Sequence, residues 1–159
     1  MKALIVVDIQ NWIMSKALYN KVSFLSVINK AIDIFRSRND LIVFVQHNNK
    51  KLVAFTEDWE LHPELHKEKD DIIIQKDHGD AFENTNLTGI LRKKEISEVC
   101  ICGLVSHGCI KSTCEGGLNN GFIVELLENG HTNWNKNSRE LIIKVNKEMK
   151  EKGIRIILI

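Results

Sequence analysis

Six apolar runs alternate with segments of helical character along the chain. The runs, rich in branched residues, lie at 2–9, 41–47, 71–75, 99–102, 122–127 and 154–159. Runs of this kind are typical of parallel strands that are buried on both faces. Helices are expected between them, at 21–39, 84–94, 109–120 and 137–152. This alternation predicts right-handed crossovers and a parallel sheet that is covered on both faces.

The predicted fold class is a three-layer α/β/α domain with a six-stranded, mainly parallel, Rossmann-like sheet. The 159 residues suffice for one sizeable core, and no repeat, low-complexity tract or linker divides them. We therefore expect a single domain over 1–159. Segments 10–20 and 48–69 are expected as loops, and long loops of compact domains usually serve a function.

Composition excludes several classes of protein. The net charge of +1 gives no electrostatic reason to expect a nucleic-acid partner. No apolar stretch approaches the ~20 residues of a membrane span, and no signal-peptide pattern is present, so we expect no membrane partner. The four cysteines cluster between 100 and 114 instead of spreading as a disulfide framework would. They indicate reduced thiols in a cytoplasmic protein.

The stretch ICGLVSHGCIKSTC at 101–114 concentrates the candidate chemistry. It places Cys109 at the first turn of a predicted helix, where free N–H groups and the helix dipole stabilise a thiolate. Asp8 and Lys76 follow two other strands, and the ligand crevice of an open parallel sheet lies beyond the carboxyl ends of its strands. Each residue alone has an ordinary structural interpretation, as a capping carboxylate, a solvated lysine or a buried thiol. Their coincidence at three strand ends favours a site.

Together the three side chains suit nucleophilic catalysis. Asp8 can accept the thiol proton of Cys109, while Lys76 can lower the thiol pKa and keep Asp8 ionised. The thiolate would then attack an electrophilic carbonyl, and Asp8 would return the proton to the leaving group. Backbone N–H groups in the turn before Cys109 can bind the oxyanion.

Three motifs resemble those of the isochorismatase-like cysteine hydrolases. They are VVDIQ at 6–10, AFENTNL at 81–87 behind Lys76, and GLVSHGCIKST at 103–113. Their order and spacing are those of the family. The resemblance implies a small-molecule substrate, no cofactor, and a homo-oligomer such as a dimer or tetramer.

The resemblance also implies roles for individual residues. The catalytic aspartate, lysine and cysteine of the family fall on Asp8, Lys76 and Cys109. The family has a cis peptide before the nucleophile, which would lie here between Leu104 and Val105. It would turn the Val105 N–H towards the site, where it would form the oxyanion hole with the Cys109 N–H.

One departure from the family bears on metal binding. Nicotinamidases of the family carry an Asp-x-His metal motif after the second strand, but 46–49 reads QHNN here. With DWELHPEL at 58–65, the segment resembles the metal-free branch without assigned substrates, so we expect no metal and no nicotinamide. His62 and His66 have metal-like spacing, but Pro63 separates them and a surface loop is the favoured interpretation.

Several further residues are candidates for the substrate pocket. They are Gln10, Ile13, His47, Trp59, Phe82 and His107. For His47 a purely structural role is equally open, and for Trp59 so is packing in a core or an interface. Cys100 and Cys102 are expected in the core, whereas Cys114 is expected on a different helix face from Cys109, which disfavours a redox pair of these two.

The expected function is hydrolysis of a small amide-like substrate through a cysteinyl acyl intermediate. A vinyl-ether hydrolase and a catalytically silent binding or assembly module remain as alternatives. A nucleotide-binding Rossmann domain is disfavoured, because 8–11 after the first strand contains no glycine.

Overall fold

A six-stranded sheet forms the middle layer of the computed structural model, which describes residues 1–159. Its strands are β1 (Ala3–Val7), β2 (Leu41–His47), β3 (Ile72–Lys76), β4 (Glu98–Leu104), β5 (Ile123–Thr132) and β6 (Arg155–Ile157). They lie in the order β3-β2-β1-β4-β5-β6, and all five pairings are parallel. The predicted three-layer fold is confirmed, with a wholly parallel sheet.

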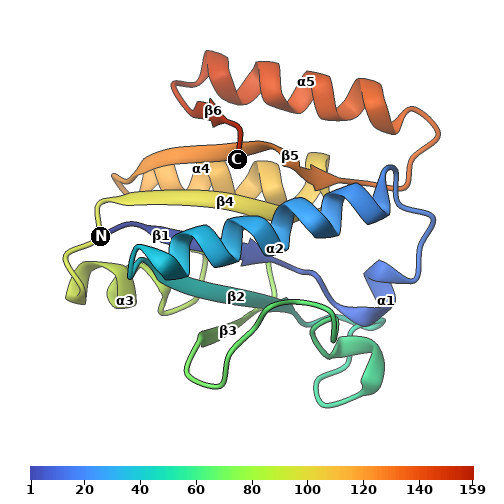
Figure 1. The fold of residues 1–159 in the computed structure, drawn as a ribbon, viewed down its shortest axis with the longest axis horizontal. Coiled ribbons are helices and arrows are strands. Elements are labelled where there is room, and N and C mark those ends of the chain that lie inside the picture. The colour runs from blue at the N-terminus through green and yellow to red at the C-terminus, as the bar shows by residue number, and fades with distance from the viewer.

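Helices cover both faces of the sheet. They are α1 (Asn11–Met14), α2 (Lys21–Ser37), α3 (Leu87–Lys93), α4 (Lys111–Asn119) and α5 (Ser138–Glu151), with a 3-10 turn η1 (Glu57–Trp59) and a π turn η2 (Ser106–Ile110). Figure 1 shows α2 in front of the sheet and α4 behind it. None of the helices combines the length and the apolar character that a membrane span requires.

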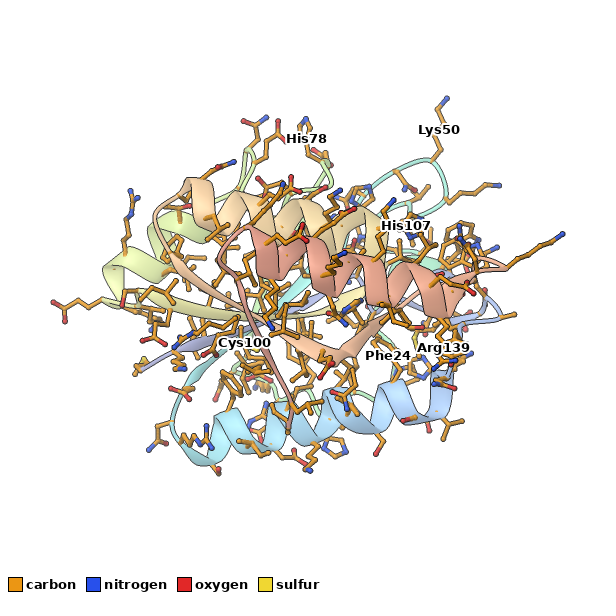
Figure 2. The ribbon with its side chains drawn as sticks, turned by 90° about the horizontal axis from the view of Figure 1, so that it is seen from above. Phe24, Lys50, His78, Cys100, His107 and Arg139 are labelled. Carbon is orange, nitrogen blue, oxygen red and sulfur yellow. The ribbon has the colours of Figure 1, made fainter.

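Two hydrophobic cores lie on opposite faces of the sheet. Strand β1 is fully buried because its successive side chains enter the two cores in turn, Leu4 beneath α2 and Ile5 beneath α3, α4 and α5. Cys100 and Cys102 lie in the α2-side core, as predicted, and Cys114 lies in the other. Figure 2 shows Cys100 in the interior, and none of the four cysteines forms a disulfide.

The structure departs from the predicted elements in two places near the edge of the sheet. Strand β5 continues to Thr132, because its pairing with β4 resumes at Gly103↔His131 after a register shift. Because the apolar run ends before the polar residues of this extension, the hydropathy pattern does not indicate that the strand continues. Helix α4 begins only at Lys111, because Gly108 (φ −110°, ψ −113°) interrupts the helical geometry within η2. A further difference is α1, a single helical turn inside segment 10–20, for which the sequence predicts a loop.

The register of the parallel strands brings distant residues to one edge of the sheet. Val7 pairs with Gly103, and His47 pairs with Lys76 at the ends of β2 and β3. Asp8 follows β1 directly, and its N–H donates to the Val45 carbonyl (3.0 Å). The carboxyl ends of β1, β2, β3 and β4 therefore gather the residues from which the sequence predicts a site.

Candidate active site

Cys109 lies in the π turn η2, which connects β4 to α4. The carbonyl of Val105 closes this turn by accepting from the N–H groups of Gly108 (3.1 Å) and Ile110 (3.3 Å). The peptide bond between Leu104 and Val105 is cis. The sulfur is thus carried by a compact turn ahead of α4, not by the first turn of a regular α-helix.

The ammonium group of Lys76 lies at the centre of the site. Its Nζ is 3.0 Å from Asp8 Oδ2 and 3.1 Å from Cys109 Sγ. It is also 2.7 Å from His47 Nδ1 and 3.0 Å from the His78 carbonyl oxygen. The side chains of Lys76 and Asp8 are 0% and 2% exposed. The structure therefore brings together the acid, the cation and the thiol that the sequence places at three strand ends.

Asp8 has one carboxylate oxygen without a partner. Its Oδ2 pairs with Lys76, whereas its Oδ1 is buried and takes part in no hydrogen bond. The residue has a left-handed backbone conformation (φ 55°), one that Asp adopts more readily than most other residues. A buried carboxylate oxygen is rarely left unpaired, so this Oδ1 is available to receive a proton.

Burial dominates the electrostatics of the thiol. It raises the pKa of Cys109 to about 12; the Asp8 carboxylate acts in the same direction, and Lys76 opposes both. Burial also raises the pKa of Asp8, against the effect of Lys76. Lys76 lowers the thiol pKa, as the sequence predicts, but burial and Asp8 outweigh it, so the net shift is upward. The thiol of the ligand-free site is neutral at pH 7.

Gln10 holds the segment around the site together. Its side-chain amide donates to the carbonyls of His47 (3.1 Å) and Trp59 (2.9 Å), and its Oε1 accepts from the His47 N–H (2.9 Å). Because all these contacts are to the backbone, the structure gives Gln10 a bracing role at the end of β2. Trp59 is buried, and its indole N–H donates to Asn48 Oδ1 (2.6 Å).

The other residues that the sequence proposes for the pocket lie in different environments. Ile13 is buried in the α2-side core, and Phe82 packs on Phe122 in the opposite core, with ring centroids 5.5 Å apart. His107 is exposed and lines a cavity of about 80 Å³ beside η2. The other lining residues of that cavity are Val105, Asn133, Trp134 and Asn135. The substrate contacts of these side chains stay predictions.

Sequence reasoning did not find His131, which supports η2 from β5. This histidine is 2% exposed and contacts Ser106 through Nδ1 and Asn146 through Nε2. The signal for it is weak, because His131 lies beyond the apolar run that ends at 127. Recognising β5 as a longer strand would have placed it beside β4.

One cluster of side chains has the composition of a metal site. Asp8, His47 and Cys109 offer ligand atoms that all lie within 4.8 Å of one another. The Lys76 ammonium, however, already lies within hydrogen-bonding distance of all three side chains. A divalent cation placed among them would meet this positive charge at close range, so the arrangement does not fit a metal ion.

The two histidines of the long 48–71 connection also take part in other contacts. His62 lies 3.1 Å from a carboxylate oxygen of Glu64, and His66 lies 2.9 Å from one of Asp33. They belong to no cluster of three or more potential ligands.

Comparisons with known proteins identify the family. The isochorismatase domain model matches residues 2–158. The uncharacterised isochorismatase family protein YddQ of Bacillus subtilis is 29% identical over 134 residues, which are 79% of this chain and 74% of that protein. Streptothricin hydrolase of Streptomyces noursei is 25% identical over 138 residues, which are 84% of this chain and 55% of that protein.

A solved structure agrees with these sequence relatives. The pyrazinamidase of Pyrococcus horikoshii, solved in complex with zinc, superposes with a TM-score of 0.86 and 26% sequence identity. The match covers 99% of each chain. With a family model that spans nearly every residue, this chain belongs to the isochorismatase domain family.

Proposed function

We propose that the protein is a cysteine-dependent hydrolase that cleaves a C–N bond in a small amide-like substrate. The proposed mechanism proceeds through a covalent cysteinyl acyl intermediate. The observation that carries this proposal is the contact of the buried Lys76 ammonium group with both Asp8 and Cys109. Oδ1 of Asp8 is left without a hydrogen-bond partner.

Attack on the substrate begins with the thiol proton. Because the Cys109 thiol is neutral at pH 7, its proton passes to Asp8 as the sulfur forms a bond to the substrate carbonyl carbon. The unpaired Oδ1 is the acceptor that suits this transfer. The transfer leaves the net charge of the site unchanged, because Lys76 stays protonated and the negative charge moves from Asp8 towards the substrate.

The carbonyl oxygen of the substrate gains negative charge in this step. The proposed oxyanion hole consists of the backbone N–H groups of Val105 and Cys109, in and beside η2. Fixed donors of this kind stabilise a developing oxyanion because they need no reorganisation during the reaction.

Release and hydrolysis complete the cycle. The C–N bond breaks, Asp8 returns its proton to the leaving nitrogen, and the acyl group remains on Cys109. A water molecule then gives a proton to Asp8 as its oxygen attacks the thioester carbonyl. The C–S bond breaks, the carboxylic acid leaves, and Asp8 returns the proton to the sulfur, which restores the thiol.

Two relatives support a substrate with an amide-like bond. One is named a streptothricin hydrolase and the other a pyrazinamidase. The proposal also includes a cytoplasmic homo-oligomer, a dimer or tetramer, which light scattering and cell fractionation would test.

The decisive experiment compares the native protein with Cys109→Ala on a panel of small amides, ureides and vinyl ethers. We expect native turnover of at least one amide or ureide and a covalent acyl adduct on Cys109 in quenched samples by mass spectrometry. Turnover of vinyl ethers alone would favour the isochorismatase-type alternative. Equal background rates for both proteins on every compound would favour a silent binding or assembly module and overturn the proposal.

A further inference from the structure

Lys76 has more hydrogen-bond acceptors around it than protons to donate. An ammonium group carries three N–H donors and no acceptor. Four atoms nevertheless lie within 3.1 Å of Nζ: Asp8 Oδ2, His47 Nδ1, the His78 carbonyl oxygen and Cys109 Sγ. One of the four must therefore do without a full hydrogen bond at any moment.

The contact with His47 is the shortest of the four. Because the ammonium only donates, Nδ1 of His47 must accept, so the imidazole is neutral and carries its proton on Nε2. Burial and the nearby Lys76 charge lower the pKa of His47, which agrees with a neutral ring. A neutral thiol is a weak acceptor, so in the ligand-free site Cys109 is the atom left out.

The backbone fixes the position of His47 opposite Lys76. The two residues pair directly in the β2–β3 register. Gln10 in turn holds both the N–H and the carbonyl of His47 through its buried side chain. The sheet register and Gln10 therefore hold the backbone of His47 in the position from which its ring contacts Lys76.

We propose that His47 is a positioning residue that accepts a hydrogen bond from one of the three Lys76 N–H groups. That N–H group is therefore not free to donate to the sulfur of Cys109. This inference rests on the proposed function, in which Cys109 is the nucleophile. When the thiol proton passes to Asp8, the S–H bond breaks and an O–H bond forms. The Lys76 N–H that donated to Asp8 then donates its hydrogen bond to the thiolate, and Lys76 stays an ammonium. No proton enters or leaves the site.

The charged groups around the two residues are few. Asp8 and Lys76 act on Cys109, whereas Lys76, Asp8, Asp77 and His78 act on His47. Substitutions at His47 leave all of these in place. A change in the pKa of the Cys109 thiol in such variants therefore shows which acceptors receive the three hydrogen bonds of the Lys76 ammonium group.

The test measures alkylation of Cys109 by iodoacetamide from neutral to alkaline pH, without substrate. His47→Phe and His47→Leu remove the acceptor, while His47→Asn keeps an acceptor oxygen near the position of Nδ1. We expect the Phe and Leu variants to have a thiol pKa lower by about one unit, and so an alkylation rate about tenfold faster below the midpoint. The Asn variant should match the native protein. Cys109→Ala gives the background, because the other three cysteines are buried.

A double-variant cycle separates this effect from general loosening of the site. In a Lys76→Met background, the further change His47→Phe should leave the alkylation rate unchanged. Faster alkylation in that background, or unchanged rates in both single variants, would overturn the inference. Because the readout needs no turnover, a failure of the substrate panel would count against the proposed function and leave this result standing.

Discussion

Nδ1 of His131 lies 2.9 Å from the hydroxyl oxygen of Ser106, the first residue of the turn that carries Cys109. On the other side of the ring, Nε2 lies 2.9 Å from Asn146 Oδ1. Asn146 uses its Nδ2 to donate to the Glu128 carbonyl, which fixes the orientation of its amide. Nε2 must therefore carry the ring proton, and Nδ1 accepts from Ser106. This line of hydrogen bonds, which joins α5 and β5 to η2, needs a neutral His131.

His131 should make stability depend on pH. Burial lowers the pKa of His131 to about 4 from its ordinary 6.5. Because the unfolded chain binds this proton first, the stabilising contribution is complete above about pH 6.5 and is lost as the pH falls towards about 4. We expect a loss on the order of 3 kcal/mol in the free energy of unfolding. Urea unfolding across this range should show a shallower dependence for His131→Asn. Parallel curves for the two proteins would contradict this assignment.

Replacing Asp8 should separate thiol acidity from catalysis. The Asp8 carboxylate raises the pKa of Cys109, so Asp8→Asn should lower that pKa and speed alkylation by iodoacetamide. The same change removes the proposed proton carrier, and hydrolysis should slow by about 10²–10⁴-fold. Parallel assays of alkylation and turnover check both halves. An Asp8→Asn protein with native turnover would eliminate the general-base role.

Gln10 offers a test of how the end of β2 is held. Gln10→Leu conserves approximate size but leaves the His47 N–H and carbonyl without their side-chain partner. Unpaired buried backbone groups cost about 1–3 kcal/mol each, so we expect a loss of about 3 kcal/mol in the free energy of unfolding. Turnover should also fall, because His47 and Trp59 lose their brace. Thermal and urea unfolding measure the first effect; a native midpoint would show that other contacts hold the segment.

Two glycines give a matched pair for stability. A Cβ on Gly103 (φ 125°) would lie 2.1 Å from the Val7 carbonyl oxygen, in the middle of the sheet, so Gly103→Ala should prevent normal folding. A Cβ on Gly89 within α3 would meet nothing within 4 Å. Gly89→Ala should therefore stabilise the protein by about 1 kcal/mol through helix propensity. Soluble yield and melting temperature of the two variants provide the comparison; equal behaviour would be inconsistent with the packing described.

The elements with strong local patterns could be predicted from the sequence alone. Apolar runs located all six strands, and the rule for parallel sheets placed Asp8, Lys76 and Cys109 at one edge. The polar end of β5 could not be predicted, because residues after Leu127 join the sheet through pairing with β4 and not through hydropathy. His131 escaped notice for the same reason.

The net shift of the Cys109 pKa was the other feature that could not be predicted from the sequence. Sequence position suggested a helix terminus and a helpful lysine. The actual pKa depends on how deeply Cys109 is buried and how near Asp8 lies, and both are properties of the packed structure. The direction of a pKa shift follows from this balance between burial and neighbouring charges, which spacing along a chain does not reveal.

The pairing of His47 with Lys76 makes the length of β3 a determinant of the site. Successive strand residues face opposite sides of a sheet, so deleting one residue from β3 would turn the lysine towards the other layer of helices. The same deletion in the connection between β2 and β3 would be absorbed before the strand begins. Evolutionary drift in loop length is therefore compatible with this chemistry, whereas a single-residue slip inside the strand is not.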